Sequence, residues 1–256
     1  MAIELSKITL EKQGDSHRID LSKRTSGGSG EIVINLRWSR GGESKKSFLN
    51  SLFSSNSSID LDLGCFWDLD ETRASGLRSI TDAEIDSLEL QGKSMDEILM
   101  LVLKNRKKSV LDALQFAHGQ GGPRNKVTKQ GCYSERPWIW HTGDDRSGSS
   151  AEGEFILVNP AGILELKRIF VYCSIYEGVA RWSETNAVVT IKAPDNPDIV
   201  VEMGKQVDAR KFCAIAAIEF DGSGGMTVRK LVSFHNGHEE CDRAYGWGME
   251  WQAGEK

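Results

Sequence analysis

Two short acidic segments, far apart in the chain, contain the residues best suited to chemistry. Residues 60–64 have the sequence Asp-Leu-Asp-Leu-Gly, and residues 143–148 have the sequence Gly-Asp-Asp-Arg-Ser-Gly, with two glutamates shortly after. Carboxylate oxygens are hard ligands, and Ca²⁺ takes about 6 to 8 oxygen donors. If folding brings the two segments together, they would form one oxygen-rich cation site with the candidate ligands Asp60, Asp62, Asp144, Asp145, Glu152 and Glu154.

The residue order in each segment predicts how it would present its oxygens. Ile59, Leu61 and Leu63 alternate with the two aspartates, so a strand would bury the aliphatic side chains and turn both carboxylates to the other face, roughly 7 Å apart. The second segment is rich in glycine and aspartate, which favours a turn-rich loop. Neither segment has the EF-hand order of ligands. A solvated strand face and an ordinary turn are the simpler alternatives.

The composition of the chain disfavours nucleic-acid-binding and membrane-spanning proteins. The chain has 256 residues, with 37 acidic against 32 basic and a net charge of -5, which disfavours a nucleic-acid-binding surface. The first residues lack a basic segment followed by an apolar one, and the aliphatic run at residues 98–103 is too short to span a bilayer. We therefore expect a soluble, cytoplasmic protein with no membrane span and no nucleic-acid partner. Five cysteines without a C-x-x-C pair predict buried, reduced thiols.

Strand patterns dominate the sequence. Residues 169–175 and 212–218 are almost continuously apolar, whereas another segment has apolar residues at every second position, namely Ile32, Ile34, Leu36 and Trp38. Both patterns are typical of strands, and their mixture indicates two sheets that face one another. Turn signals such as Asn159-Pro160 and Asp221-Gly222 separate these segments. We predict an all-β fold, a two-sheet β-sandwich that forms a single domain over residues 1–256.

One region departs from the strand pattern. Residues 81–84 and 94–97 each have the order of a capping box. The second precedes an apolar-rich segment that we expect to be helical over residues 95–117. We therefore predict a helical insertion at residues 74–135 within the sandwich domain. Its apolar residues, 98–103, must be buried either on the sandwich or on another subunit.

Five motifs, in order along nearly the whole chain, carry a resemblance to a known family. They are residues 31–38 (EIVINLRW), 59–65 (IDLDLGC), 143–148 (GDDRSG), 186–191 (NAVVTI) and 245–249 (YGWGM). At these motifs the chain closely resembles the TerD family of tellurium-resistance and stress proteins, and in particular its TerA-like branch. Further residues resemble that branch as well, namely 14–20, Gly237, His238, Asp242 and Tyr245.

The resemblance implies a calcium-binding β-sandwich, with ligands from the D-x-D strand and the acidic loop. Asp60 and Asp62 match the strand aspartates of the family. Asp144 and Asp145 match its loop pair, Glu154 matches an acid that follows the loop, and Glu152 is a looser match.

Two departures from the family pattern qualify this expectation. Residues 149–151 are Ser-Ser-Ala, whereas the more acidic family members have further carboxylates after the loop, so we expect one firm calcium site. The segment between Asp70 and Trp138 is longer than the usual connection in the family, so the helical insertion has no role carried over from it.

Other chemistry has weaker support in the sequence. A hairpin turn at Asn236-Gly237, followed by a close-packed strand at residues 245–251, is a simpler interpretation than a zinc or copper site formed by His235, His238 and Cys241. His141, just before the acidic loop, could hydrogen-bond near the ion. The hydrolase signatures G-x-S-x-G and H-E-x-x-H and the P-loop are absent.

These observations lead to one expected function and two alternatives. We expect a non-enzymatic calcium-binding module, a sensor or scaffold with protein partners in a cytoplasmic stress response that includes tellurite resistance. The first alternative is a metal-dependent, hydrolase-like enzyme that uses the same acidic site, with His141 as the nearest acid or base in sequence. The second is calcium-bridged docking on anionic lipid.

Overall fold

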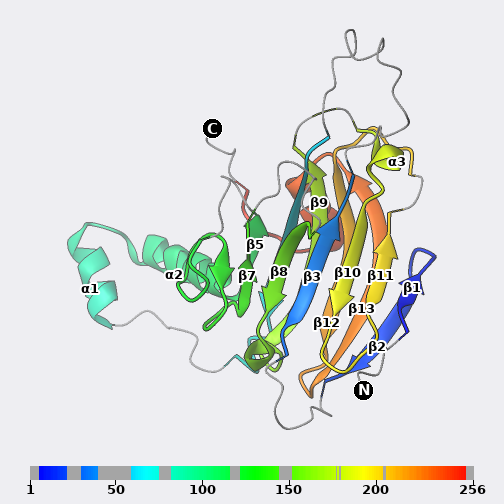
Figure 1. Cartoon of the computed structure of the whole chain (residues 1–256). Helices are drawn as coiled ribbons and strands as arrows, with labels where there is room; N and C mark the ends of the chain where they lie inside the picture. Colours follow the sequence, from blue (N-terminus) through cyan, green and yellow to red (C-terminus); the bar gives the residue numbers. More distant parts are fainter. Residues whose placement is uncertain are drawn as a thin grey trace.

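The computed structural model describes residues 6–21, 30–39, 59–74, 82–115, 122–143, 152–176, 178, 180–203 and 206–251, but only the backbone of Asp82, of residues 103–109 and of Gln115. In these residues thirteen strands form two sheets that pack face to face (Figure 1). The seven-stranded sheet has the order β1 (Ile8–Leu10), β11 (Ile199–Glu202), β10 (Val188–Lys192), β3 (Ile32–Arg37), β8 (Glu154–Val158), β7 (Ile139–His141) and β6 (Gly131–Cys132). The six-stranded sheet has the order β2 (Ser16–Asp20), β13 (Gly225–His235), β12 (Phe212–Phe220), β9 (Leu166–Ile175), β4 (Leu61–Leu69) and β5 (Leu111–Gln115). The predicted all-β, two-sheet sandwich is confirmed.

Alternation along the strands fills the space between the two sheets. In β3 the predicted positions Ile32, Ile34 and Leu36 are buried in the main core. Side chains at every second residue of a strand share one face, and each buried aliphatic side chain stabilises the fold by about 1.5–3 kcal/mol relative to exposure. Neighbouring strands are antiparallel except at one edge, where β1 pairs with β11 in parallel.

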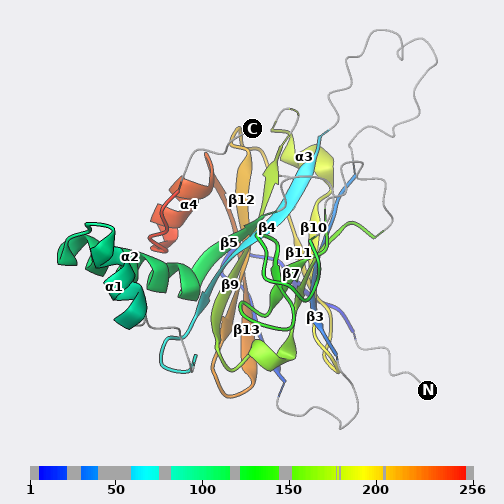
Figure 2. The ribbon, with the colours of Figure 1, turned by 90° about the vertical axis from the view of Figure 1, so that its left-hand side faces the viewer.

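The outer face of the six-stranded sheet is also buried. Helix α4 (His238–Tyr245) lies beside this sheet (Figure 2), and a second cluster forms on it from Phe66, Tyr172, Phe212 and Trp247. Because β9 and β12 are covered on both faces, their sequences are almost continuously apolar.

The carboxylate of Asp242 fixes the chain that follows α4. It accepts hydrogen bonds from the backbone N–H groups of Gly248 (2.7 Å) and Met249 (2.8 Å) and from the indole N–H of Trp251 (2.9 Å). The predicted hairpin at residues 236–237 and strand at residues 245–251 were therefore wrong. Residues 238–245 are helical, with two glutamates in the first turn that favour the positive end of the helix dipole, and the aromatic residues after the helix pack on a sheet face.

Helices α1 (Asp82–Leu90) and α2 (Met95–Val110) form a hairpin beside the sandwich. The capping box at the start of α2 is confirmed, because the Ser94 N–H and hydroxyl donate to the Glu97 carboxylate at 2.7 and 2.9 Å, and the Glu97 N–H donates back to the hydroxyl at 3.3 Å. In the other capping-box segment, Thr81 lies outside the described residues.

The second helix ends earlier than predicted. It stops at Val110, and the next residues form β5, which pairs with Gly64–Asp68 of β4. Sheet pairing therefore overrides the helical pattern, so the helices of the predicted insertion cover residues 82–110, whereas β5 and β6 belong to the sheets. Two shorter helices lie elsewhere, α3 (Trp182–Thr185) and the 3-10 helix η2 (Pro160–Gly162). In the described part of the chain, no helix has the length and apolar character needed to cross a membrane.

Candidate metal site

The first acidic segment lies at the start of β4. Leu61 and Leu63 are buried in the core between the sheets, and Asp62, between them in sequence, lies on the opposite side of β4. The carbonyl of Asp60 accepts a hydrogen bond from the Tyr176 N–H (3.0 Å), so the extended backbone continues to this residue. The alternation is as predicted, but Asp60 is only 8% exposed and is not turned into solvent as a freely solvated face would be.

The strands that flank the second acidic segment, β7 before it and β8 after it, are both bonded to β4. Before the segment, Nε2 of His141 in β7 lies 2.9 Å from the carbonyl oxygen of Leu63. After the segment, the carboxylate of Glu154 in β8 accepts a hydrogen bond from the Leu63 N–H at 2.7 Å. Strands β7 and β8 belong to the seven-stranded sheet and β4 to the six-stranded sheet, so these bonds join the two sheets. They fix both ends of residues 142–153 at the residue that follows Asp62.

The pairing of β4 explains why these two side chains are needed. Strand β5 pairs with β4 only from Gly64 onward, so its ladder does not include Leu63. Buried backbone N–H and C=O groups must be hydrogen-bonded, and a buried carboxylate is costly unless it accepts such bonds. His141 and Glu154 are both fully buried and meet both needs. Alternation along β8, in which Glu154 shares a face with buried Ile156, is the sequence signal for its burial.

The imidazole of His141 is held in one tautomer. Its Nδ1 accepts a hydrogen bond from the Gly143 N–H (3.1 Å), so Nε2 carries the proton and donates it to the carbonyl of Leu63. Nε2 is also 3.9 Å from the carboxylate of Glu154. A buried ring with both nitrogens occupied is poorly placed to act as a general base.

The remaining predicted ligands have different outcomes. Asp144 and Asp145 lie outside the described residues. Glu152 is exposed, and its carbonyl accepts a hydrogen bond from the Asn35 amide (2.7 Å), which also donates to the carbonyl of Glu154 (3.1 Å). Among the residues that the structure describes, no group of three or more His, Cys, Asp or Glu side chains could hold a metal ion. Oxygen donors at the start of β4 have the chemistry that Ca²⁺ requires, and the further donors would have to come from the acidic loop.

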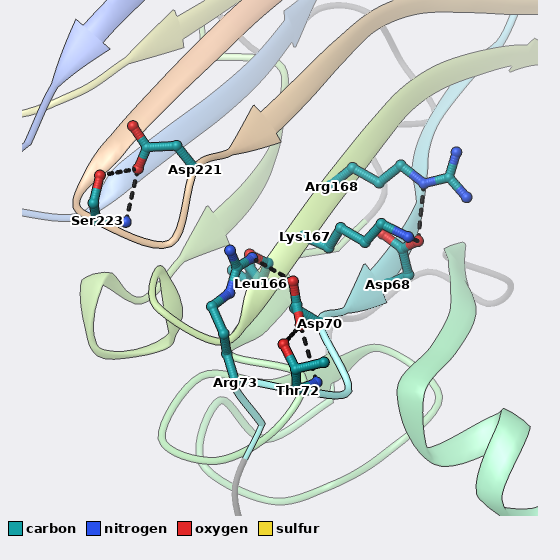
Figure 3. Close-up of polar contacts among 9 residues, drawn as sticks. All are labelled: Asp68, Asp70, Thr72, Arg73, Leu166, Lys167, Arg168, Asp221 and Ser223. Atoms are coloured by element: carbon teal, nitrogen blue, oxygen red, sulfur yellow. Dashed lines mark hydrogen bonds and ion pairs between the residues drawn. The ribbon is translucent and has the colours of Figure 1, made fainter.

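Other carboxylates at one end of the sandwich are held by protein groups (Figure 3). Asp68 accepts a hydrogen bond from the Arg168 guanidinium (2.9 Å) and lies 3.7 Å from the Lys167 ammonium. Burial raises the pKa of Asp68, against the effect of the neighbouring Arg168. Asp221 accepts hydrogen bonds from the N–H groups of Ser223 and Gly225, which lower its pKa to about 2. Asp221 belongs to a turn that the sequence predicts, whereas no sequence signal marks Asp68, and the contacts of both residues indicate structural roles.

Asp70 makes a local turn at the same end of the sandwich. Its carboxylate accepts hydrogen bonds from the N–H (2.9 Å) and hydroxyl (2.5 Å) of Thr72 and lies 3.3 Å from the guanidinium of Arg73. The same guanidinium donates to the carbonyl of Leu166 at 3.0 Å. Side-chain-to-backbone bonds of this kind are typical of aspartate at a turn.

The alternative set of His235, His238 and Cys241 makes separate contacts. His235 Nε2 is 3.0 Å from the Ser233 hydroxyl, and His238 Nε2 is 3.1 Å from the Tyr172 hydroxyl. Cys241 belongs to the outer aromatic cluster, where burial raises the pKa of its thiol to about 12. Its sulfur is therefore a poor metal ligand and a poor nucleophile at neutral pH.

The cysteines are buried and reduced, as predicted: Cys65, Cys132, Cys173, Cys213 and Cys241. Burial raises the thiol pKa of Cys65, Cys173 and Cys213 as well. Thiols of this kind lack the thiolate character that redox chemistry needs.

Comparison with known proteins gives one strong sequence relative. No family model matches the chain. The chain is 32% identical over 254 residues to a tellurium resistance protein TerA from an Alcaligenes species, a match that covers 99% of this chain and 60% of that protein. The chain therefore spans about 60% of the length of this curated relative.

Two solved structures are similar at low sequence identity. A protein of unknown function has a TM-score of 0.48 and 10% identity, covering 87% of this chain and 99% of its own. A homologue of the telluride resistance protein TerD from Streptomyces coelicolor A3(2) has a TM-score of 0.44 and 11% identity, covering 84% of this chain and 95% of its own. The resemblance drawn from the sequence motifs is confirmed by the sequence relative: over nearly its whole length, this chain is a homologue of the tellurium resistance protein TerA.

Proposed function

We propose that this chain is a non-enzymatic calcium-binding module that acts as a sensor or scaffold, with protein partners, in a cytoplasmic stress response associated with tellurite resistance. Homology to a tellurium resistance protein supports the association with tellurite. The two acidic segments support the ion, with Asp60 and Asp62 from the strand and Asp144 and Asp145 from the loop as the main ligands.

One observation carries the proposal, namely the anchoring of residues 142–153 at Leu63. His141 and Glu154 bond to the carbonyl and N–H of this residue from the two ends of the loop. The residues that flank the loop therefore lie beside Asp62, which supports a site with ligands from both acidic segments. Glu154 uses one carboxylate oxygen in this anchoring, so we expect it to position the loop and to contribute at most one oxygen to the ion.

The same arrangement suggests how an ion would act as a signal. Clustered carboxylates repel one another, and a divalent ion bound only by the native state stabilises it, by about 2.7 kcal/mol when free calcium is 100 times Kd. Calcium would also compensate part of the cost of burying Asp60. Because the residues that flank the loop bond across the two sheets, we expect ion binding in the loop to stabilise the contact between β4 and strands β7 and β8.

Calorimetric titration with Ca²⁺, together with thermal unfolding in chelator and in calcium, tests the proposal. We expect saturable binding of one ion, a rise in Tm with calcium and a smaller rise with magnesium, because Mg²⁺ demands near-ideal octahedral geometry and loses its water ligands reluctantly. Asp60→Asn and Asp144→Asn should each remove both signals. Glu219→Gln is the control for lost negative charge, because Glu219 in β12 makes an exposed ion pair with Arg229 in β13. This variant should keep both the calcium binding and the rise in Tm. A melting curve that does not change between chelator and calcium would contradict the proposal.

Hydrolysis assays separate this function from a metal-dependent enzyme. We expect the metal-loaded protein to turn over phosphoesters and esters no faster than Asp144→Asn. The burial of His141 and the engagement of both its ring nitrogens argue against its use as the base. Turnover that requires both the metal and Asp144 would support the enzyme instead.

A further inference from the structure

Four side chains on the outer face of the six-stranded sheet form a series of polar contacts outside the candidate metal site. Strand β13 provides Ser233 and His235, and helix α4 provides Glu240 and Tyr245. The Ser233 hydroxyl oxygen lies 3.0 Å from Nε2 of His235 and 2.6 Å from the Tyr245 hydroxyl oxygen. On the other side of the ring, Nδ1 of His235 lies 3.9 Å from the Glu240 carboxylate. A hydroxyl, an imidazole and a carboxylate in this order are the parts of a nucleophilic serine site.

The backbone beside the serine has an unusual conformation. In the pairing of β12 with β13 the register shifts between Ala214 and Ala216, where β13 has two residues opposite one residue of β12. Within this bulge Val232 has a φ of 44°, in the left-handed region that a β-branched side chain rarely adopts. Bulges often lie next to active sites, where they redirect a side chain, and strained residues cluster at functional sites. The strain at Val232 therefore draws attention to the hydroxyl of Ser233 beside it.

The charges around the imidazole suit a general base. Burial lowers the pKa of His235, so the ring is neutral at pH 7 and Nε2 can accept a proton. The Asn236 side-chain amide donates to the Glu240 carboxylate at 2.5 Å and lowers the pKa of that carboxyl. An ionised carboxylate on this side of the ring favours the tautomer with the proton on Nδ1. Asp208 and Arg210, paired at 2.6 Å, also act on the ring, and their effects on the pKa of His235 oppose one another.

The surroundings of Ser233 favour an uncharged group. Ser233 is half-buried, and the rings of Phe212 and Tyr245 have their centroids 6.4 and 5.8 Å from the centroid of the His235 ring. Aromatic neighbours accommodate an apolar acyl group, whereas a phosphate dianion would lose hydration beside them. In the six-stranded sheet β13 is three strands from β4, or about 14 Å at about 4.8 Å per strand. The serine is therefore separate from the candidate metal site.

We propose that Ser233 is a covalent acceptor of acyl groups from activated carboxylic esters, with His235 as its general base and Glu240 as the positioning residue. The serine oxygen forms a bond to the ester carbonyl carbon, and the bond from that carbon to the leaving oxygen breaks. The serine proton passes to Nε2 of His235 and from there to the leaving oxygen, so atoms and charges balance. One acyl group on each chain is a modification without turnover. It goes beyond the proposed calcium binding and does not require the ion.

Reaction of the full chain with p-nitrophenyl acetate, in the presence of a chelator, tests the proposal independently of the metal site. We expect peptide mass spectrometry to find an acetyl group on Ser233. Ser233→Ala should lose this product, and His235→Gln should slow its formation at least about a hundredfold. Ser223→Ala, in the turn between β12 and β13, is the matched control and should keep the wild-type rate at Ser233. A wild-type chain that stays unmodified at Ser233, or a His235→Gln chain that reacts at the wild-type rate, overturns the proposal.

The pH dependence of the reaction tests the base and its carboxylate without relying on one variant. The wild-type rate at Ser233 should rise with pH as far as the pKa of His235, which lies below 6.5, and stay level above it. Because the Glu240 carboxylate raises this pKa, Glu240→Gln should move the rise to lower pH, a shift that a purely structural role would not produce. Circular dichroism verifies that each variant is folded. A wild-type rate that keeps rising in proportion to hydroxide overturns the role of His235, and an unshifted profile in Glu240→Gln overturns that of Glu240.

Discussion

The sandwich and the helical hairpin differ in which groups they bury. At its edges the sandwich buries charged and polar side chains, among them Lys230, Glu154 and His141, and each has hydrogen-bond partners from a different strand. The hairpin exposes leucine and methionine. Buried polar groups and exposed apolar patches are the two informative departures from an ordinary surface. The first kind reveals how the two sheets are joined, and the second leaves apolar surface in contact with solvent.

Lys230 is the clearest buried charge in the sandwich. Its ammonium donates to the carbonyl oxygens of Leu10, Glu11 and Glu202, each at 3.0 Å. Burial lowers its pKa. Because Lys230 is in β13 and two of these carbonyls belong to β1 and β11, the ammonium joins the two sheets at the edge far from β5.

Removal of this ammonium is the largest effect that we predict. Lys230→Ala leaves three carbonyl groups without their charged donor and should lower the free energy of unfolding by about 3 kcal/mol, measured by urea denaturation. Arg229→Ala, at the neighbouring exposed ion pair with Glu219, is the control and should cost less than about 1 kcal/mol. Equal losses of unfolding free energy in the two variants would show that the buried hydrogen bonds of Lys230 stabilise the fold no more than an exposed ion pair does.

A buried histidine on the outer face of the six-stranded sheet, His238, should make the stability of the fold depend on pH. Burial lowers the pKa of His238 to about 4, where it contacts the Tyr172 hydroxyl. Since the folded pKa is below the unfolded value of about 6.5, the stabilisation is present above about pH 6.5 and is lost as pH falls toward 4. The loss should be at most about 3 kcal/mol.

Urea denaturation at a series of pH values measures this effect. His238→Phe should reduce the slope between about pH 6.5 and 4. Burial lowers the pKa of His235 as well, so part of the slope should persist in the variant. An identical pH profile in wild type and variant would contradict the assignment to His238.

Glu154 tests the link between the sheets at the acidic loop. Glu154→Ala leaves the buried Leu63 N–H without its acceptor, which should lower the free energy of unfolding by about 2 kcal/mol. If the loop is anchored there, the variant should also weaken calcium binding in the calorimetric titration. Glu219→Ala is the control, because Glu219 makes an exposed ion pair with Arg229 far from the loop, and it should leave stability nearly unchanged.

The smallest predicted effect is confined to the hairpin. Ser94→Ala removes the capping box of α2 and should destabilise that helix by about 1 kcal/mol. Hydrogen exchange should therefore become faster in α2 and stay unchanged in β9 and β12, because α1 and α2 project away from the two sheets (Figures 1 and 2). Faster exchange throughout the sandwich would show that hairpin and sandwich unfold as one unit.

Several features could be predicted from the sequence because they depend on local periodicity. The alternation at Ile32, Ile34 and Leu36 predicted the buried face of β3, and the order Ser94 to Glu97 predicted the start of α2. The end of α2 could not be predicted in this way. Residues 111–115 continue an apolar pattern that suits a helix, but the unpaired edge of β4 makes them a strand. Tertiary contacts also decide the aromatic residues after Tyr245. They pack on the outer face of the six-stranded sheet and do not form a strand.

The sequence by itself determined that the chain has two packed layers of strands, a capped helix and two acidic segments, because these follow from the spacing of neighbouring residues. Only the tertiary structure decided that His141 and Glu154 bond to the backbone of Leu63, 78 and 91 residues away, and that Lys230 bonds to β1 and β11. Contacts of this kind depend on which backbone groups a sheet leaves unpaired at its edge. No local sequence pattern predicts which backbone groups stay unpaired, because the pairing depends on the register and length of strands that are distant in the chain.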